Sequence, residues 1–253
     1  MDTATDTRSA TGRIELHASP EAVWKALTDA AELVRWFPLE ARVEPGEGGS
    51  IFMSWKNEHA AESKILAWEP MKRLVTSWGW GDDAESQPQM TEYLIESQGE
   101  TTILSVVTSG FPNDPSWDAY VEGTNNGWIF ELQSLKQYLE GHAGQDRDAV
   151  TVRRRTPISA EDAWTRVFSD AGLGSRPLQG APFNEVRPVQ YAAIVDEGIF
   201  RVSFEPCGSG SGTESREVAL WLQAWGHDRE RLPAVEAKWH LLLESLFPEG
   251  ETL

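Results

Sequence analysis

Apolar and polar residues alternate with a period of two from Leu39 to Phe111. This period is typical of β-strands that turn one face toward a core. Turn residues such as Pro45-Gly46 and Gly99-Glu100 interrupt the alternation at short intervals. The pattern predicts an antiparallel meander of six strands, at 39–44, 48–56, 61–69, 72–80, 89–97 and 101–109.

Helical signals precede the meander, after a short extended segment at 13–18. Ser19-Pro20-Glu21 supplies an N-cap, a proline at the first helical position and an early acidic residue. The apolar residues of 23–27 follow at helical spacing. A second short helix is expected to begin at Asp29 and to end at Pro38.

The longest helical pattern follows Pro115. Apolar residues recur there at steps of three and four, at Trp117, Tyr120, Val121, Thr124, Trp128, Leu132, Leu135 and Leu139. We expect one long helix, ending near Gly141, whose apolar stripe covers the aromatic-rich face of the meander. These elements predict an α+β fold in which an antiparallel sheet wraps on a long C-terminal helix.

The opening pattern returns after a linker at about 141–149. Ser19-Pro-Glu-Ala-Val-Trp24 corresponds to Ser159-Ala-Glu-Asp-Ala-Trp164, and Trp128-x3-Leu132 corresponds to Trp239-x3-Leu243. Two correspondences in the same order indicate a duplication. The second copy is shorter by about one hairpin. Its predicted elements are strands at 187–196, 198–206 and 214–225 and a final helix at 228–247. We therefore predict two domains, residues 12–142 and a truncated copy at residues 150–248.

Composition narrows the partners. The chain has 40 acidic and 22 basic residues, a formal net charge of −18, which disfavours nucleic acid and anionic membranes. The one cysteine, Cys207, has no partner for a disulfide, and no run of eighteen apolar residues occurs. We expect a cytoplasmic protein that binds neither nucleic acid nor membranes, with a homodimer left open.

Four segments of the first half resemble the START-like (SRPBCC) superfamily and, within it, the family of activator of heat-shock protein 90 ATPase homologues. They are Ile14–Thr28, Arg73–Trp78, Thr102–Phe111 and Gly127–Leu139. The resemblance implies a helix-grip fold, in which a curved sheet holds the long helix and often encloses a hydrophobic ligand cavity. Members of the family often have a histidine where this chain has Thr108. The eukaryotic co-chaperone also has a client-binding N-terminal domain, which the residues before Gly12 are too few to form. Stimulation of a chaperone ATPase is therefore not expected.

Large aromatic side chains are unusually frequent in the first half, which holds eight of the twelve tryptophans. Such side chains either fill a core or line a pocket. The candidate ligand-binding residues are Trp36, Phe37, Phe52, Trp55, Trp78, Trp80, Tyr93, Trp117, Tyr120, Asn125 and Trp128. Asn125 is included because its amide could hydrogen-bond a ligand carbonyl.

Catalytic motifs are lacking: no metal, nucleotide or nucleophile signature stands in a supporting context, so no cofactor and no metal are expected. His17 and His59 are candidate bases that Glu62, Glu92 or Asp118 could pair with, but nothing in the spacing requires these groups to come together. Arg153-Arg154-Arg155 is expected to be a solvated stretch of strand.

Three functions follow as hypotheses. The first is noncatalytic binding of a small hydrophobic or aromatic molecule. The second is a cyclase or hydratase that uses cavity groups such as His17, Glu92 or Tyr93, and the third is a stress-response or chaperone-associated accessory protein, which rests on the family resemblance alone.

Overall fold

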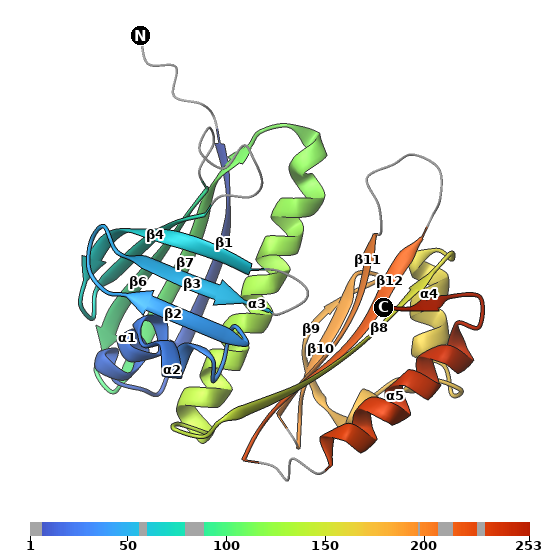
Figure 1. Ribbon diagram of the computed structural model, residues 1–253. Coiled ribbons are helices and arrows are strands. Elements are labelled where there is room, and N and C mark those ends of the chain that lie inside the picture. Colours follow the sequence, from blue (N-terminus) through green and yellow to red (C-terminus); the bar gives the residue numbers. More distant parts are fainter. Residues whose placement is uncertain (1–6, 56–59, 79–88, 197, 207–214, 227–230) are drawn as a thin grey trace. The chain divides into compact units, whose positions relative to one another are not determined.

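A computed structural model describes residues 7–55, 60–78, 89–196, 198–206, 215–226 and 231–253. The chain forms two compact units, Met1–Asp146 and Arg147–Leu253. Each unit is built on its own antiparallel sheet (Figure 1). His59, Trp80 and Cys207 lie outside the described residues, as does the side chain of Trp78.

Within the described part of the first unit, seven antiparallel strands form a sheet in the order β1-β7-β6-β5-β4-β3-β2. Their bounds are β1 Thr7–Leu16, β2 Glu40–Glu44, β3 Ser50–Ser54, β4 Ala60–Glu69, β5 Arg73–Trp78, β6 Gln89–Gln98 and β7 Thr101–Pro112. Strands β2 to β7 are the six predicted from the alternation, and consecutive strands are neighbours, as a meander requires. The predicted antiparallel sheet is confirmed.

Two short helices, α1 Pro20–Thr28 and α2 Ala30–Leu33, close one end of this sheet (Figure 1). The Ser19 hydroxyl accepts a hydrogen bond from the backbone N–H of Ala22 at 3.3 Å. The Asp29 carboxylate accepts from the N–H groups of Ala31 and Glu32 at 2.9 and 3.2 Å. These N-caps satisfy otherwise unpaired backbone donors, which is why the chain starts a new helix at each point.

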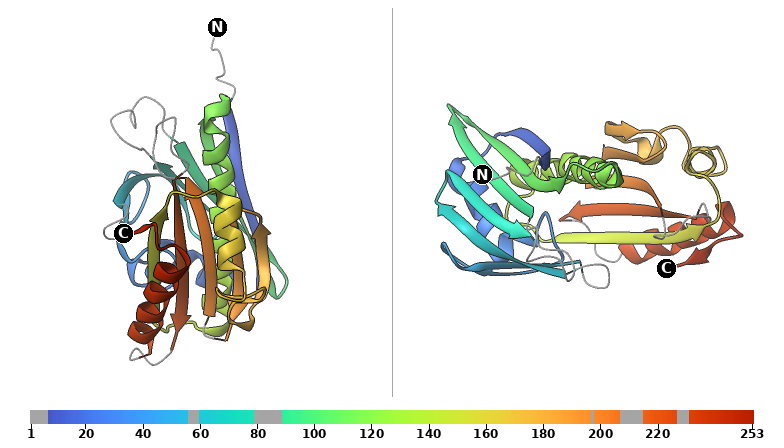
Figure 2. Two further views of the ribbon diagram at one scale, coloured as in Figure 1. Left: turned by 90° about the vertical axis from the view of Figure 1, so that its right-hand side faces the viewer. Right: turned by 90° about the horizontal axis from the view of Figure 1, so that it is seen from above.

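The long predicted helix is α3, Asp118–Gly141, which follows a 3-10 turn at Pro115–Trp117 and runs alongside β1 (Figures 1 and 2). Trp128 and Leu132 face the sheet and are buried. Gly12 allows β1 and α3 to approach closely, because a Cβ at this position would lie 2.7 Å from Leu132 Cδ1 and 3.0 Å from Trp128 Cβ. The helix-grip arrangement of sheet and helix is therefore present in this unit.

The second unit has a six-stranded sheet in the order β13-β8-β12-β11-β10-β9. Its strands are β8 Arg147–Thr156, β9 Ala181–Val186, β10 Gln190–Val195, β11 Gly198–Pro206, β12 Arg216–Trp225 and β13 Glu251–Thr252. Two helices, α4 Ala160–Val167 and α5 Leu232–Leu246, accompany it, together with a 3-10 turn at Pro177–Gln179. Trp164 of α4 lies 5.4 Å from Phe204, and Trp239 of α5 lies 5.5 Å from Phe200, between ring centroids. Both helices thus pack on β11, and strand, helix, strands, helix occur in this order in both units.

One prediction for the second unit is wrong. Arg154 is not solvated but buried, because its guanidinium donates hydrogen bonds to the carbonyls of Phe247 at 2.7 Å and Gly250 at 2.8 Å. Its neighbours Arg153 and Arg155 do pair with acidic side chains, Glu217 and Glu251. Arg154 therefore fastens the end of the chain to β8.

Among the described residues, no helix combines the length and hydrophobicity that a membrane crossing requires.

Candidate functional site

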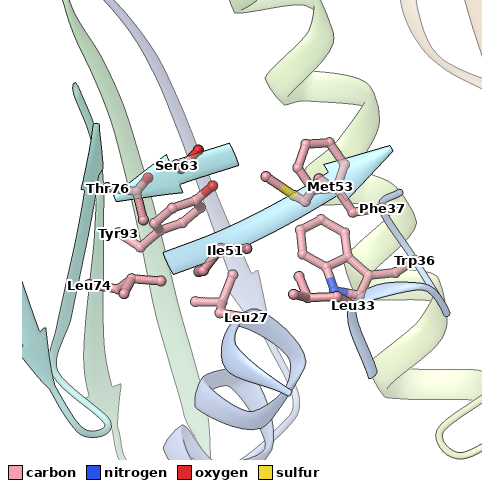
Figure 3. Close-up of a pocket in the computed structure, with 10 residues that line it drawn as sticks. All are labelled: Leu27, Leu33, Trp36, Phe37, Ile51, Met53, Ser63, Leu74, Thr76 and Tyr93. Atoms are coloured by element: carbon pink, nitrogen blue, oxygen red, sulfur yellow. The ribbon is translucent and has the colours of Figure 1, made fainter. Parts of the chain in front are cut away.

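In the first unit, a pocket lies between the inner face of the sheet and the segment formed by α1, α2 and the residues that follow α2 (Figure 3). Ten residues line it: Leu27, Leu33, Trp36, Phe37, Ile51, Met53, Ser63, Leu74, Thr76 and Tyr93. None of these side chains is charged at neutral pH. The pocket is therefore apolar apart from a few hydroxyl groups.

Strand alternation decides which residues of β3 reach the pocket. Ile51 and Met53 line it, and Phe52 between them points to the opposite face of the sheet. There the guanidinium of Arg42, its partner on β2, lies 3.8 Å from the centre of the Phe52 ring. Phe52 therefore has a contact on the outer face and is separated from the pocket by the sheet.

The same rule places the pocket residues of the neighbouring strands. Ser63 of β4 lies directly across from Ile51, and Tyr93 of β6 directly across from Leu74 of β5. Thr76, two residues after Leu74, shares its face. Four adjacent strands thus contribute to one side of the pocket.

Hydrogen bonds fix the helical side of the pocket. The indole N–H of Trp36 donates to the Ala26 carbonyl at 2.9 Å, and the Ser134 hydroxyl of α3 donates to the Trp36 carbonyl at 2.7 Å. All three residues are buried. The segment that follows α2 is therefore fastened to both α1 and α3.

A charged cluster beside this segment strengthens the attachment. Glu32 pairs with Lys25 at 2.9 Å and Arg35 at 3.1 Å, and it accepts a hydrogen bond from the Tyr138 hydroxyl of α3. Burial acts to raise the pKa of Glu32, but these partners outweigh it and hold the pKa below its ordinary value. Glu32 is thus a carboxylate that joins the two short helices to the long one.

Phe37 is where the pocket meets the surface. It is half-buried, whereas the other nine lining residues are buried. Its ring stacks on Trp36 with centroids 5.0 Å apart, and the edge of Trp55 meets it at 5.2 Å. Phe37 lies between the four-residue helix α2 and the edge strand β2, outside both elements.

One end of the pocket is polar. Figure 3 shows the side-chain oxygens of Ser63, Thr76 and Tyr93 gathered at the same end, away from Phe37 and Met53. The Ser63 hydroxyl is buried and has no hydrogen-bond partner among the described residues. Burial raises the pKa of Tyr93 well above its usual range, so this phenol stays neutral.

The open space is small. The cavity has a volume of about 10 Å³, which is close to what a single water molecule needs. Sites for drug-sized ligands enclose about 300–1,000 Å³. The pocket is therefore closed by its own side chains in this conformation.

The aromatic residues proposed from the sequence divide into groups. Trp36, Phe37 and Tyr93 line the pocket, and Trp55 contacts Phe37 at its mouth. Trp128 packs behind it, with its ring centroid 5.8 Å from that of Tyr93 and 6.0 Å from that of Phe37. These five candidates form one connected aromatic group.

Other candidates lie elsewhere. Trp117 and Tyr120 form an edge-to-face pair at the start of α3, with centroids 5.4 Å apart, and Tyr120 also contacts Phe111 at 5.7 Å. The Asn125 amide oxygen accepts a hydrogen bond from the Thr11 backbone N–H at 2.8 Å, which ties α3 to β1. Phe52 lies on the outer face, while Trp80 and the side chain of Trp78 lie outside the described residues.

Seven lining residues were not among the sequence candidates: Leu27, Leu33, Ile51, Met53, Ser63, Leu74 and Thr76. The alternation does place Ile51 with Met53 and Leu74 with Thr76, each pair on one face of its strand. The sequence candidates were aromatic residues, whereas the strand face that a residue occupies decides whether it lines the pocket.

The proposed acid and base groups do not converge. Glu92 pairs with Arg73 at 2.5 Å, while its neighbour Tyr93 points to the other face of β6 and into the pocket. His17 is exposed beyond the end of β1. Among the described residues, no group of three or more His, Cys, Asp or Glu side chains could hold a metal ion.

Comparison with known proteins gives a family match for the first unit. Residues 17–140 match the family model described as activator of Hsp90 ATPase homolog 1-like protein. No curated protein matches the chain. The solution structure of the Aha1 dimer from Colwellia psychrerythraea is 24% identical over 54% of this chain and 99% of that chain, with a TM-score of 0.48.

Two further solved structures are similar. A protein from Mesorhizobium loti is 24% identical over 53% of this chain and 97% of that chain, with a TM-score of 0.48. DynU16, from the dynemicin biosynthetic locus, is 16% identical over 94% of this chain and 97% of that chain, with a TM-score of 0.47.

Proposed function

We propose that this chain binds a small apolar molecule in the pocket beneath Phe37 and releases it unchanged. The proposal starts from the match of residues 17–140 to the family of activator of Hsp90 ATPase homolog 1-like proteins. One observation carries the proposal: the pocket is lined without any charge, and the buried Ser63 hydroxyl that faces it has no partner among the described residues. Ligand sites are typically apolar with a small number of polar groups. A buried polar group without a partner is destabilising, so its place in a pocket favours a binding role.

Binding requires the pocket to widen. Phe37 is the side chain best placed to move, since it is the most exposed of the lining residues. Rotating its ring outward breaks the contacts with Trp36, Trp55 and Trp128, each worth about 0.5–1.5 kcal/mol. Burying about 120 Å² of apolar ligand surface contributes about 3 kcal/mol, which offsets this cost. A ligand of roughly the size of one aromatic ring therefore contributes free energy of the same order as the cost of moving Phe37.

The separation of the acid and base candidates supports binding over catalysis. General acid–base chemistry needs both groups within hydrogen-bond reach of one reacting molecule. Glu92 faces away from the pocket and His17 is exposed, so Tyr93 has neither as a partner.

Calorimetric titration of the full chain with neutral aromatic compounds tests the proposal, with two variants for comparison. Phe37→Leu shortens the side chain at the mouth and is expected to raise apparent affinity several-fold, because less free energy is spent on opening. Phe52→Leu removes an aromatic ring from the neighbouring strand on the outer face of the sheet, and it is expected to bind as the unaltered chain does.

Two results would contradict the proposal. The first is the absence of binding heat across the panel up to the solubility limit of each compound. The second is an equal response of Phe37→Leu and Phe52→Leu, since this would place the compounds outside the pocket.

A further inference from the structure

A row of buried hydroxyl groups crosses the inner face of the first sheet. It consists of Ser63 on β4, Thr76 on β5, Thr91 on β6 and Thr108 on β7, and these strands are consecutive neighbours. Thr76 lies directly across from Thr91, and Thr91 directly across from Thr108. All four side chains are buried, with exposures between 1% and 6%. We refer to these residues as the hydroxyl row.

The Thr108 end of the hydroxyl row is satisfied. The indole N–H of Trp128, which can only donate, gives its hydrogen to Thr108 Oγ1 at 2.9 Å. Thr108 Oγ1 and Thr91 Oγ1 share a hydrogen bond at 3.1 Å. This end therefore serves the packing of α3 on the sheet.

The Ser63 end differs. Ser63 Oγ faces the pocket and has no hydrogen-bond partner among the described residues, although the side chain is 1% exposed. The oxygens of Thr76 and Tyr93 gather at the same end of the pocket (Figure 3). Three hydroxyls therefore lie at one end of an apolar space, and that of Ser63 has unused hydrogen-bonding capacity.

We infer that this end of the hydroxyl row is the polar anchor of the ligand site and that it selects a neutral molecule with one oxygen, a hydroxyl or a carbonyl, on an apolar body. The inference rests on the proposed function and names the ligand class of that same pocket. A hydroxyl both donates and accepts, so Ser63 can pair with either kind of oxygen. An anionic ligand is disfavoured because none of the ten lining residues can neutralise a buried carboxylate.

Three ring compounds of matched shape test the anchor: p-cresol, toluene and p-toluate. Titrated into the full chain, p-cresol is expected to bind about tenfold more tightly than toluene, the equivalent of one additional hydrogen bond. The anion p-toluate is expected to bind more weakly than either.

Ser63→Ala removes the anchor hydroxyl and little else. In this variant the affinity for toluene is expected to stay the same and the preference for p-cresol to fall to about twofold or less. Its unfolding midpoint is expected to equal or exceed that of the unaltered chain, because the deleted hydroxyl has no partner.

Ser134→Ala is the matched control. Its hydroxyl is also fully buried but donates to the Trp36 carbonyl at 2.7 Å. This variant is expected to lower the unfolding midpoint and to keep the preference for p-cresol. The two serines thus separate a binding role from a structural one.

The outcomes distinguish the anchor from the proposed function. Four results would each overturn the anchor while leaving apolar binding intact. Two concern the unaltered chain: equal affinities for p-cresol and toluene, or tighter binding of p-toluate. The other two concern Ser63→Ala: an undiminished preference for p-cresol, or a lowered unfolding midpoint. Failure of all three compounds to bind would overturn the proposed function and the anchor with it.

Discussion

Tyr93 has two roles: its ring takes part in the aromatic packing, and its hydroxyl lies at the polar end of the pocket. The ring meets Trp128 edge to face at 5.8 Å. Burial alone raises the pKa of the phenol, since the ionised form would have to exist in an apolar space. At neutral pH the group is therefore a neutral donor in position to meet a ligand oxygen.

This raised pKa makes stability depend on alkaline pH. The unfolded chain releases the tyrosine proton near pH 10, while the native state retains it, so the native state binds more protons above that pH. The contribution is complete below about pH 10 and is lost as pH rises beyond it, by up to about 1.4 kcal/mol per pH unit. Urea unfolding at pH 9, 10 and 11 is expected to show a steeper decline for the unaltered chain than for Tyr93→Phe, which keeps the ring. Parallel declines would contradict the assignment.

For single residues, the sequence predicted the aromatic character of the site but not its polar end. The number of tryptophans in the first half indicated a pocket or a dense core, and Trp36, Phe37 and Tyr93 do line the pocket. Ser63 carried no signal, because a serine on a strand is ordinarily solvated. Its significance comes from a neighbourhood that four strands assemble, and spacing along one strand does not contain that information.

The approach of β1 to α3 shows how one element positions another. The Thr11 N–H donates to Asn125, and Gly12 lies beneath Trp128 and Leu132. Because the Trp128 ring then reaches Phe37 and Tyr93, the separation of β1 and α3 sets the depth of the space under the helix.

Two glycine substitutions test the close contact of β1 and α3, and they are expected to change the free energy of unfolding in opposite directions. Gly12→Ala puts a methyl group 3.0 Å from Trp128 Cβ, and it is expected to lower the free energy of unfolding by about 1–3 kcal/mol. Gly127→Ala lies within α3 where nothing stands within 4 Å of the added methyl, and it is expected to raise this free energy by about 0.5–1 kcal/mol. Chemical denaturation of both variants measures the difference. A neutral or stabilising Gly12→Ala would show that the two elements are not in close contact.

Element prediction succeeded where large apolar residues mark most of the inward positions. The strands of the meander, the caps at Ser19 and Asp29, and the long helix are examples. Strand β1 begins at Thr7, earlier than predicted. Its inward residues Ala10 and Gly12 are small, so this part of the strand lacks the alternation of large apolar residues by which strands were predicted. Strand β9 was missed because Ala181–Val186 lacks the alternation that marks a strand.

The division of the chain into two units suggests that each unit folds by itself. Each has its own antiparallel sheet and helices, and the second has its own buried cluster that includes Trp164, Trp239 and Phe200. The predicted domains, residues 12–142 and 150–248, remain our proposal for units that fold independently. The repeated order of elements is consistent with duplication, while α2 has no counterpart among the described residues of the second unit.

Separate expression tests that proposal. Residues 1–146 and residues 147–253, prepared individually, are each expected to give one cooperative thermal transition monitored by near-ultraviolet circular dichroism. The second fragment keeps the C-terminal residues because Arg154 binds the carbonyls of Phe247 and Gly250. A fragment without a cooperative transition would mean that it cannot fold without the other.

The chain's methionines provide the most direct measurement of the central claim, that the pocket beneath Phe37 receives a small apolar molecule. The sequence has four methionines. Met53 lines the pocket, whereas Met71 and Met90 are 39% and 42% exposed and act as internal controls. In a chain labelled with 13C at the methionine methyl groups, titration with p-cresol is expected to shift the Met53 resonance in a saturable manner and to leave those of Met71 and Met90 in place. An unmoved Met53 resonance at saturating p-cresol, or equal shifts at Met71 and Met90, would contradict the account.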